Sequence, residues 1–156
     1  MNIGIFTDTY YPQTNGVATS TRVLTEELQN RGHNVFVFAP DVRGITKMYC
    51  VFRVPSIRFL PIPTYRLALP YSHKAKKLIK NLNLDIIHTQ TEFSLGLFGY
   101  YMSKILDIPN VHTYHTMYED FIHYIKLKPK VAQVASRIIC NRAKRIVVPS
   151  EKAKMP

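Results

Sequence analysis

The first forty residues hold the pattern that most constrains the fold. An apolar run, NIGIFTD (2–8), is followed by a loop, an amphipathic stretch (17–31) and a second apolar run, NVFVFAP (34–40). The apolar side of the amphipathic stretch recurs at helical spacing: Val17, Thr21, Leu24 and Leu28. Gly32 then favours a helix C-terminus. Strand, helix and strand are therefore predicted in succession, which indicates a βαβ unit with parallel strands and a right-handed crossover.

The same alternation continues along the chain. Further strands are predicted at 49–54, 85–90, 110–116 and 145–150, the last of them buried. Helices are predicted at 72–84, 94–107 and 129–144. Ser94 is a candidate N-cap, and the four prolines within 55–70 exclude a central strand there. The pattern predicts an α/β, Rossmann-like three-layer domain with a mostly parallel sheet over residues 1–150, followed by the start of a helix at 151–156.

Composition limits the class of protein. No apolar run reaches the roughly 18 residues of a membrane span. Asp8 interrupts the apolar start and no basic region precedes it, which argues against a signal peptide. Cys50 and Cys140 lack metal or redox spacing, so both are expected to be reduced, buried thiols of a cytoplasmic protein.

Charge is spread unevenly. The net charge is +11, and residues 41–156 carry 19 Lys and Arg against seven Asp and Glu. Such a surface attracts nucleic acid, anionic lipid or phosphorylated substrates. Basic residues are interspersed with apolar ones over 53–80, namely Arg53, Arg58, Arg66, Lys74, Lys76, Lys77 and Lys80. The stretch 72–84, which contains the four lysines, is typical of a basic amphipathic helix. These basic residues suggest contact with an anionic membrane surface, the alternative being a solvated outer helix, and 124–130 is a second candidate.

The loop at 9–16 is the first candidate site. Ligands of parallel sheets bind beyond the carboxyl ends of the strands, where this loop lies. Asn15, Gly16 and Val17 mark a helix start whose N–H groups suit a donor phosphate, unless Asn-Gly is only a turn. Tyr10 and Tyr11 either form an apolar wall for a lipid-like acceptor or pack on a neighbouring loop. For Asp8 we expect loop-orienting hydrogen bonds rather than ligand contact.

Three segments resemble a known family. IGIFTDTYYPQTNGVATSTRVLTEELQNRGHNVFVFAP looks like the opening of the retaining glycosyltransferases of family 4. DIIHTQTEFSLGLFG and NVHTYHTMYEDFIHYI resemble two further signatures of these enzymes. Within the last, HTMYEDF is similar to the branch of bacterial 1,2-diacylglycerol 3-glucosyltransferases.

The resemblance implies an architecture and an activity. Family 4 enzymes have two Rossmann-like domains facing each other across a cleft, the GT-B arrangement. This chain corresponds to the N-terminal, acceptor-side domain, and its partner would be the C-terminal, nucleotide-sugar domain. The implied reaction transfers glucose from UDP-glucose to diacylglycerol at the inner face of the cell membrane. The alternatives are a sugar-chain acceptor in polysaccharide assembly and, last, a nucleic-acid-binding module, against which the absence of any nucleic-acid motif counts.

Candidate residues follow from the motifs. The resemblance implies that His115 contacts the donor sugar beside its anomeric carbon, where an imidazole can bond a hydroxyl or stabilise developing charge. The alternative is a structural histidine, which we expect for His112. Glu119 and Asp120 either act as acid and base or bind the acceptor, or are first-turn residues of a helix.

A second group follows the strand predicted at 85–90. His88, Thr89 and Glu92 are expected to contact acceptor or donor at the same edge of the sheet. No histidine, cysteine or carboxylate spacing indicates a metal ligand set, so neither a metal nor a cofactor is expected besides the nucleotide-sugar substrate.

Overall fold

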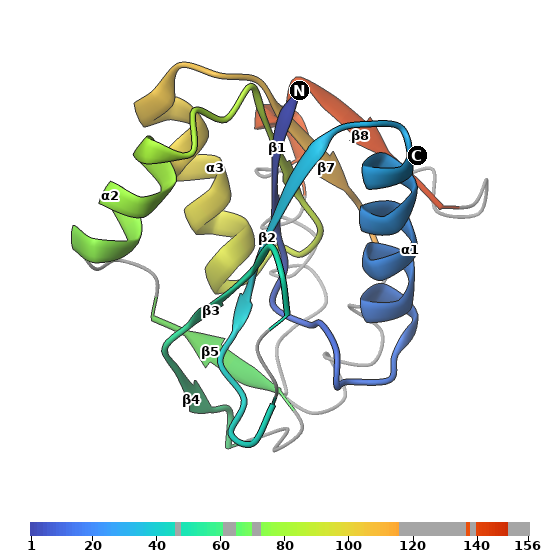
Figure 1. Ribbon diagram of the computed structural model, residues 1–156, viewed down its shortest axis with the longest axis vertical. Coiled ribbons are helices and arrows are strands. Elements are labelled where there is room, and N and C mark those ends of the chain that lie inside the picture. Colours follow the sequence, from blue (N-terminus) through green and yellow to red (C-terminus); the bar gives the residue numbers. More distant parts are fainter. Residues whose placement is uncertain (46–47, 61–64, 70–72, 116–136, 138–139, 150–156) are drawn as a thin grey trace.

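The core of the protein is a parallel sheet covered by helices on both faces (Figure 1). The computed structural model describes residues 1–45, 48–60, 65–69, 73–115, 137 and 140–149. Six strands pair in the order β3-β2-β1-β6-β7-β8, and every pair is parallel. They are β1 (Asn2–Phe6), β2 (Asn34–Pro40), β3 (Val51–Val54), β6 (Ile86–Thr89), β7 (Asn110–Thr113) and β8 (Arg145–Val147).

Three helices cover this sheet in the described chain: α1 (Gly16–Asn30), α2 (His73–Asn81) and α3 (Ser94–Leu106). Helix α1 lies on one face, and α2 and α3 lie on the other (Figure 1). The predicted Rossmann-like three-layer fold is therefore confirmed. The predicted helix at 129–144 lies mostly outside the described residues, of which 137 and 140–142 are helical.

The N-terminal βαβ unit forms as predicted. Strands β1 and β2 pair in parallel from Asn2 opposite Asn34 to Phe6 opposite Phe38. Gly32 has φ +81°, and its N–H donates to the carbonyl of Gln29 at 2.9 Å. A left-handed residue just past the helix costs glycine no Cβ clash, which explains why α1 ends here.

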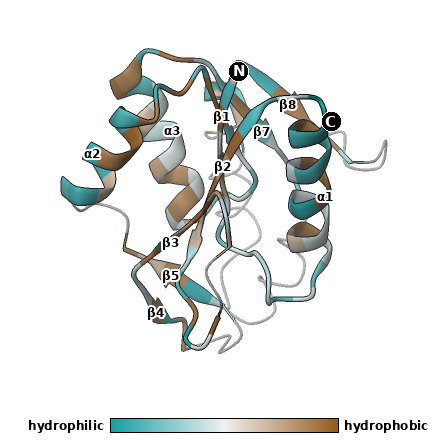
Figure 2. Cartoon of the chain, viewed as in Figure 1, coloured by the Kyte–Doolittle hydropathy of each residue, from teal (hydrophilic) through white to brown (hydrophobic). Residues whose placement is uncertain are grey.

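Each face of the sheet has its own core. Under α1 the strands contribute Ile3, Ile5, Val35, Val37 and Ala39. Under α2 and α3 the core contains Phe6, Phe38, Ile79, Ile87, Leu95, Phe98 and Met102. Because neighbouring residues of a strand face opposite sides, both faces need apolar residues, and β1 and β2 are therefore nearly continuous apolar runs (compare the brown parts of these strands in Figure 2).

One local expectation is confirmed and two are wrong. The described part of the proline-punctuated stretch 55–70 contributes no strand to the main sheet; it contains β4 (Ser56–Arg58) and β5 (Arg66–Ala68), a small antiparallel pair beside that sheet. Strand β8 is exposed, since it lies at the edge of the sheet. Cys140 is buried and Cys50 only half-buried, and both are free thiols.

Packing of α3 on the sheet depends on small residues. A Cβ at Gly99 would come within 2.9 Å of both Phe6 and Thr89. Glycine therefore lets α3 lie close over β1 and β6, which places its first turn at the carboxyl ends of these strands. No helix in the described ranges is both long enough and apolar enough to cross a bilayer.

Candidate functional site

The strand order places a crevice between β1 and β6. From β1 the chain proceeds to β2 on one side, whereas β6 and β7 lie on the other side. The loops after β1 and β6 therefore diverge, and this is where parallel sheets bind ligands. The N–H of Gln90, just past β6, donates to the carbonyl of Phe6 at 2.9 Å and joins the two strand ends.

Helix α1 begins at this crevice with an N-cap from its own sequence. The Oδ1 atom of Asn15 accepts the N–H of Ala18 at 2.9 Å, and its Nδ2 donates to the hydroxyl of Thr9 at 2.7 Å. The N–H groups of Gly16 and Val17 have no partner among the described residues. Asn15 is thus occupied by the cap, and two N–H groups at the positive end of the helix remain for a ligand.

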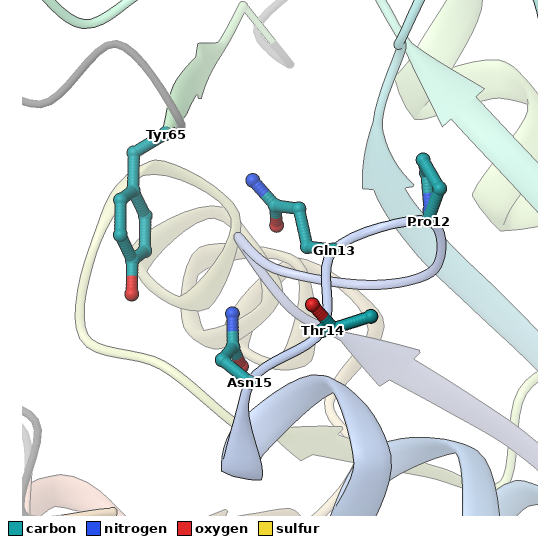
Figure 3. Close-up of a pocket in the computed structure, with 5 residues that line it drawn as sticks. All are labelled: Pro12, Gln13, Thr14, Asn15 and Tyr65. Atoms are coloured by element: carbon teal, nitrogen blue, oxygen red, sulfur yellow. The ribbon is translucent and has the colours of Figure 1, made fainter.

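A pocket of about 400 Å³ lies in front of this helix start. It is lined by Pro12, Gln13, Thr14, Asn15 and Tyr65 (Figure 3). Tyr65 comes from the segment before β5 and faces the loop that carries the other four residues (Figure 3). A Cβ at Gly16 would meet no atom within 4 Å, so the helix start is open on this side. Amides, a hydroxyl and one aromatic ring suit a ligand rich in oxygen atoms.

Helix α3 begins at the same edge but is closed by Asp8. The buried Asp8 carboxylate accepts the hydroxyls of Thr91 and Ser94, both at 2.6 Å, and the N–H groups of Leu95 and Gly96 at 2.9 and 3.4 Å. Burial raises the pKa of Asp8, and these four hydrogen bonds oppose that rise.

This carboxylate replaces the predicted cap. Phe93 stands at the N-cap position without a side-chain bond, and Ser94 donates to Asp8 instead, so the prediction of Ser94 as N-cap is wrong. The expectation that Asp8 orients its own loop is therefore wrong: its carboxylate bonds the start of α3 instead.

His115 follows β7 and is buried. Its Nε2 lies 3.0 Å from Oε1 of Gln90. Burial, and secondarily the charge of His112, lowers the pKa of His115 to about 4, so the imidazole is neutral at pH 7. A neutral ring offers one donor and one acceptor.

Behind it runs a buried relay of hydroxyl, imidazole and carboxylate. Thr89 Oγ1 lies 2.9 Å from Nδ1 of His112, and His112 Nε2 lies 3.2 Å from Oε1 of Glu92. The order is that of a hydrolase triad, but the threonine is 1% exposed and out of reach of substrate. The relay is therefore structural, as predicted for His112.

Comparison with known proteins identifies the family. The sequence profile of Glycosyltransferase Family 4 matches residues 14–155. The chain belongs to glycosyltransferase family 4. It is 43% identical over 97% of its length to an alpha-monoglucosyldiacylglycerol synthase of Streptococcus pneumoniae, and 36% identical over 94% to one of Acholeplasma laidlawii. It spans about 36% of the length of each relative.

More distant matches include a further transferase and two solved structures. A GDP-mannose-dependent alpha-mannosyltransferase of Mycobacterium tuberculosis is 26% identical over 96% of the chain, which covers 42% of that protein. Among solved structures, the UDP-GlcNAc 2-epimerase of Methanocaldococcus jannaschii aligns with a TM-score of 0.58 at 10% identity, over 97% of this chain and 40% of the epimerase. Sucrose-phosphate synthase of Thermosynechococcus elongatus gives 0.57 at 14%, over 96% and 42%. At these identities the structures show the fold alone.

Three predicted contact residues of this family 4 chain are buried in the protein. Tyr10 is 3% exposed and packs in the core under α1, which removes it from a loop-tip wall for an acceptor. Thr89 and Glu92 are held in the relay with His112, so direct substrate contact by their side chains is not supported. Tyr11, in contrast, is 48% exposed and remains a candidate.

His88 is half-buried beside the site. Its Nε2 lies 2.7 Å from the hydroxyl of Thr113. Burial lowers the pKa of His88 to about 4, with smaller contributions from His112 and His115. The ring is therefore neutral at pH 7, and its ligand contact stays a prediction.

The basic residues fall into two groups. Arg53 donates to the carbonyls of Pro40 and Tyr11 at 3.2 and 2.6 Å, and Arg66 donates to Ser56. These guanidinium groups are half-buried and already bonded within the protein, and their contact with a membrane stays a prediction. Exposed cations remain at Arg58, Lys74, Lys77 and Lys80.

Helix α2 carries its apolar and basic residues on different sides (Figure 2). Ile79 is buried against the sheet, whereas Leu78 is 38% exposed, so Leu78 does not share the inward face with Ile79. Lys76 is half-buried and donates to the Tyr101 hydroxyl at 3.2 Å, which ties it to α3.

Some predicted residues lie outside the described part of the chain, and some residues of the site were not predicted. Glu119, Asp120 and the basic stretch 124–130 lie outside the described residues. Gln90 and Tyr65 were not predicted as site residues, although Gln90 is the last residue of the strand predicted at 85–90. Among the described residues, no group of three or more His, Cys, Asp or Glu side chains is placed to hold a metal ion.

Proposed function

We propose that this chain is the acceptor-side domain of a membrane-associated glycosyltransferase that transfers glucose from UDP-glucose to diacylglycerol. The observation that carries the proposal is 43% identity, over 97% of the chain, to a protein named alpha-monoglucosyldiacylglycerol synthase. The open start of α1 beside a pocket supports it, because both suit a sugar diphosphate.

In this proposal the residues divide the work by their chemistry. The N–H groups of Gly16 and Val17 and the positive end of α1 offset the charge of the diphosphate. The neutral imidazole of His115 bonds a hydroxyl of the donor sugar and fixes its orientation before the glycosidic bond to the nucleotide breaks. Contacts with the base and ribose belong to a C-terminal domain of the same protein.

The decisive experiment is a product assay on the full-length protein. Vesicles containing diacylglycerol are offered with UDP-glucose or with GDP-mannose, and lipid products are identified by mass spectrometry. We expect monoglucosyldiacylglycerol from UDP-glucose only. A mannosylated product would favour the chemistry of the mycobacterial relative, and transfer only to oligosaccharides would favour polysaccharide assembly. Residues 1–156 alone should show no transfer.

His115→Ala tests the assigned contact with the donor. Losing one oriented hydrogen bond near developing charge lowers turnover by roughly 10²–10³. His33→Ala, on the loop before β2, is the matched control and should keep parental turnover. Turnover of His115→Ala within twofold of the parent, in a folded protein, would exclude the role.

Membrane association is assigned to the exposed lysines of α2. Each cation near an anionic surface contributes roughly 1 kcal/mol, so Lys74, Lys77 and Lys80 together give reversible binding. Changing all three to Gln should weaken co-sedimentation with anionic vesicles. A control removes equal charge elsewhere: Arg22, Arg31 and Lys144, all exposed, changed to Gln. Equal loss in both variants would show that only total charge matters.

A further inference from the structure

Gln90 stands out because its side chain is buried and only half satisfied. It is 1% exposed and lies immediately after β6, at the crevice between β1 and β6. Its Oε1 atom bonds His115, and its backbone N–H bonds the carbonyl of Phe6. Its Nε2 atom is the one buried side-chain nitrogen or oxygen in the described residues that has no hydrogen-bond partner.

An unpaired amide nitrogen in this place has a cost. Leaving a buried donor unsatisfied destabilises a protein, and a leucine or methionine would fill the same volume without that cost. The half that is satisfied points at His115 alone. The amide is therefore explained by what it does for the imidazole and not by the stability of the core.

We infer that Gln90 is a positioning residue for the reaction proposed above: its Oε1 accepts Nε2–H of His115 and so keeps Nδ1 of the ring as a hydrogen-bond acceptor for a donor-sugar hydroxyl. The inference rests on the proposed function for the identity of the ligand, but not for the state of the ring. A neutral imidazole has one donor and one acceptor, and the partner of one nitrogen decides the role of the other.

The neighbouring histidine shows what a ring without this freedom looks like. His112 is bonded at both nitrogens, by Thr89 and by Glu92, and no atom is left for a ligand. His115 has one hydrogen-bond partner among the described residues, which is Gln90. The ring of His112 is thus held at both nitrogens, whereas the ring of His115 is held at Nε2 only.

An amide suits this task better than a carboxylate would. The titratable groups near His115 in the described chain are His112 on β7, His88 on β6 and, beyond His112, Glu92 after β6. A glutamate in place of Gln90 would stabilise the imidazolium, which has two donors and no acceptor, and Nδ1 would then repel the hydroxyl hydrogen it is proposed to accept.

The test combines spectroscopy with kinetics on the full-length protein. Long-range ¹H–¹⁵N spectra at pH 7 should show His115 as the neutral Nε2–H form in the parent. In Gln90→Met the fraction of this form should fall, while the signals of His112 stay unchanged. In Gln90→Glu the titration midpoint of His115 should rise from about pH 4 to about pH 5–7.

Turnover should follow the state of the ring. A wrong tautomer in a hydrolase triad costs about 10⁴ in kcat, and for a histidine that orients a hydroxyl we expect roughly 10–100-fold in both variants, with little change in the KM for the donor. Gln29→Glu, on the exposed side of α1, adds the same charge and should leave both readouts unchanged.

The outcomes separate two failures. His115 spectra identical in the parent and in a folded Gln90→Met would overturn the inference, as would altered spectra with parental kcat. If the parent transfers no sugar to any acceptor, the proposed function fails, and the spectra alone then decide whether Gln90 sets the state of His115.

Discussion

Helices α1 and α3 begin at the same edge of one sheet (Figure 1), but their N-terminal ends are capped in different ways. The start of α3 is filled by the Asp8 carboxylate, which takes two N–H groups and two hydroxyls. The start of α1 is capped by Asn15 through a single N–H group, and it opens on a pocket. The start of α3 is thus occupied by a carboxylate of the protein itself, whereas the start of α1 is open to an anionic ligand.

The difference shows how a fold with two equivalent anion sites can commit one of them to structure. Unpaired N–H groups and the helix dipole favour a negative charge at both places. Because Asp8 occupies the start of α3, α1 is the helix start that remains open for the proposed diphosphate.

The largest effect is expected from Gly96→Ala at the closed start. A Cβ there would overlap the backbone carbonyl of Thr91, which cannot move aside cheaply. We expect the free energy of unfolding to fall by more than about 4 kcal/mol, or the protein not to fold. Gly16→Ala is the control, because a Cβ at the open start meets nothing within 4 Å. Equal stability of the two variants in denaturant titrations would contradict this picture of α3.

Asp8→Asn should come next. The substitution keeps the shape but replaces one acceptor oxygen by a donor that faces other donors, so we expect a loss of about 2–4 kcal/mol. Asp107→Asn removes the same charge at the far end of α3 and should change stability by less than about 1 kcal/mol. If the two variants unfold at the same denaturant concentration, Asp8 is not the cap described here.

Asn15→Ala should be milder. It removes one capping bond from a helix start that is open to solvent, which typically costs about 1 kcal/mol. Asn15→Asp, which can still accept from Ala18, should recover most of that loss. A cost as large as that of Asp8→Asn would mean that the open start is as deeply built into the core as the closed one.

The smallest effect on stability and the sharpest on binding is expected from Gly16→Val. A branched side chain would occupy the approach to the N–H groups of Gly16 and Val17 while stability stays within about 1 kcal/mol of the parent. Donor affinity, measured by calorimetry on the full-length protein, should fall, and Gly16→Ala should lie between. Unchanged affinity for the donor would show that the diphosphate does not bind at this helix start.

Sequence patterns predicted the sheet because each strand is a local apolar run. The bounds of β2 were correct to the residue, and Gly32 identified the end of α1. Interactions between distant segments were harder to see. The sequence placed Asp8 near its own loop, whereas it bonds residues 83 to 88 positions away. No spacing rule connects such residues before the strand order is known.

Burial explains the errors at the site. Tyr10 and Glu92 follow strands and Thr89 ends β6, which are places expected to meet ligands, yet Tyr10 and Thr89 are buried and the carboxylate of Glu92 is bonded to His112. Arg53 and Arg66 were counted as surface charge, although their forked guanidinium groups bond backbone carbonyls or serine. A side chain's chemistry states what it can bond, but only the fold decides whether its partner is solvent, ligand or protein.

The pairing of β1 with β6 affects how the nascent chain can fold during translation. Strand β1 lies in the middle of the sheet, but its second neighbour begins at Ile86. Translation proceeds at roughly 5–20 residues per second, so after β2 has emerged β1 waits several seconds with one edge unpaired. Such an edge is a template for another nascent strand. The interval between β2 and β6 is when chaperone contact, measurable by crosslinking stalled chains, should matter most.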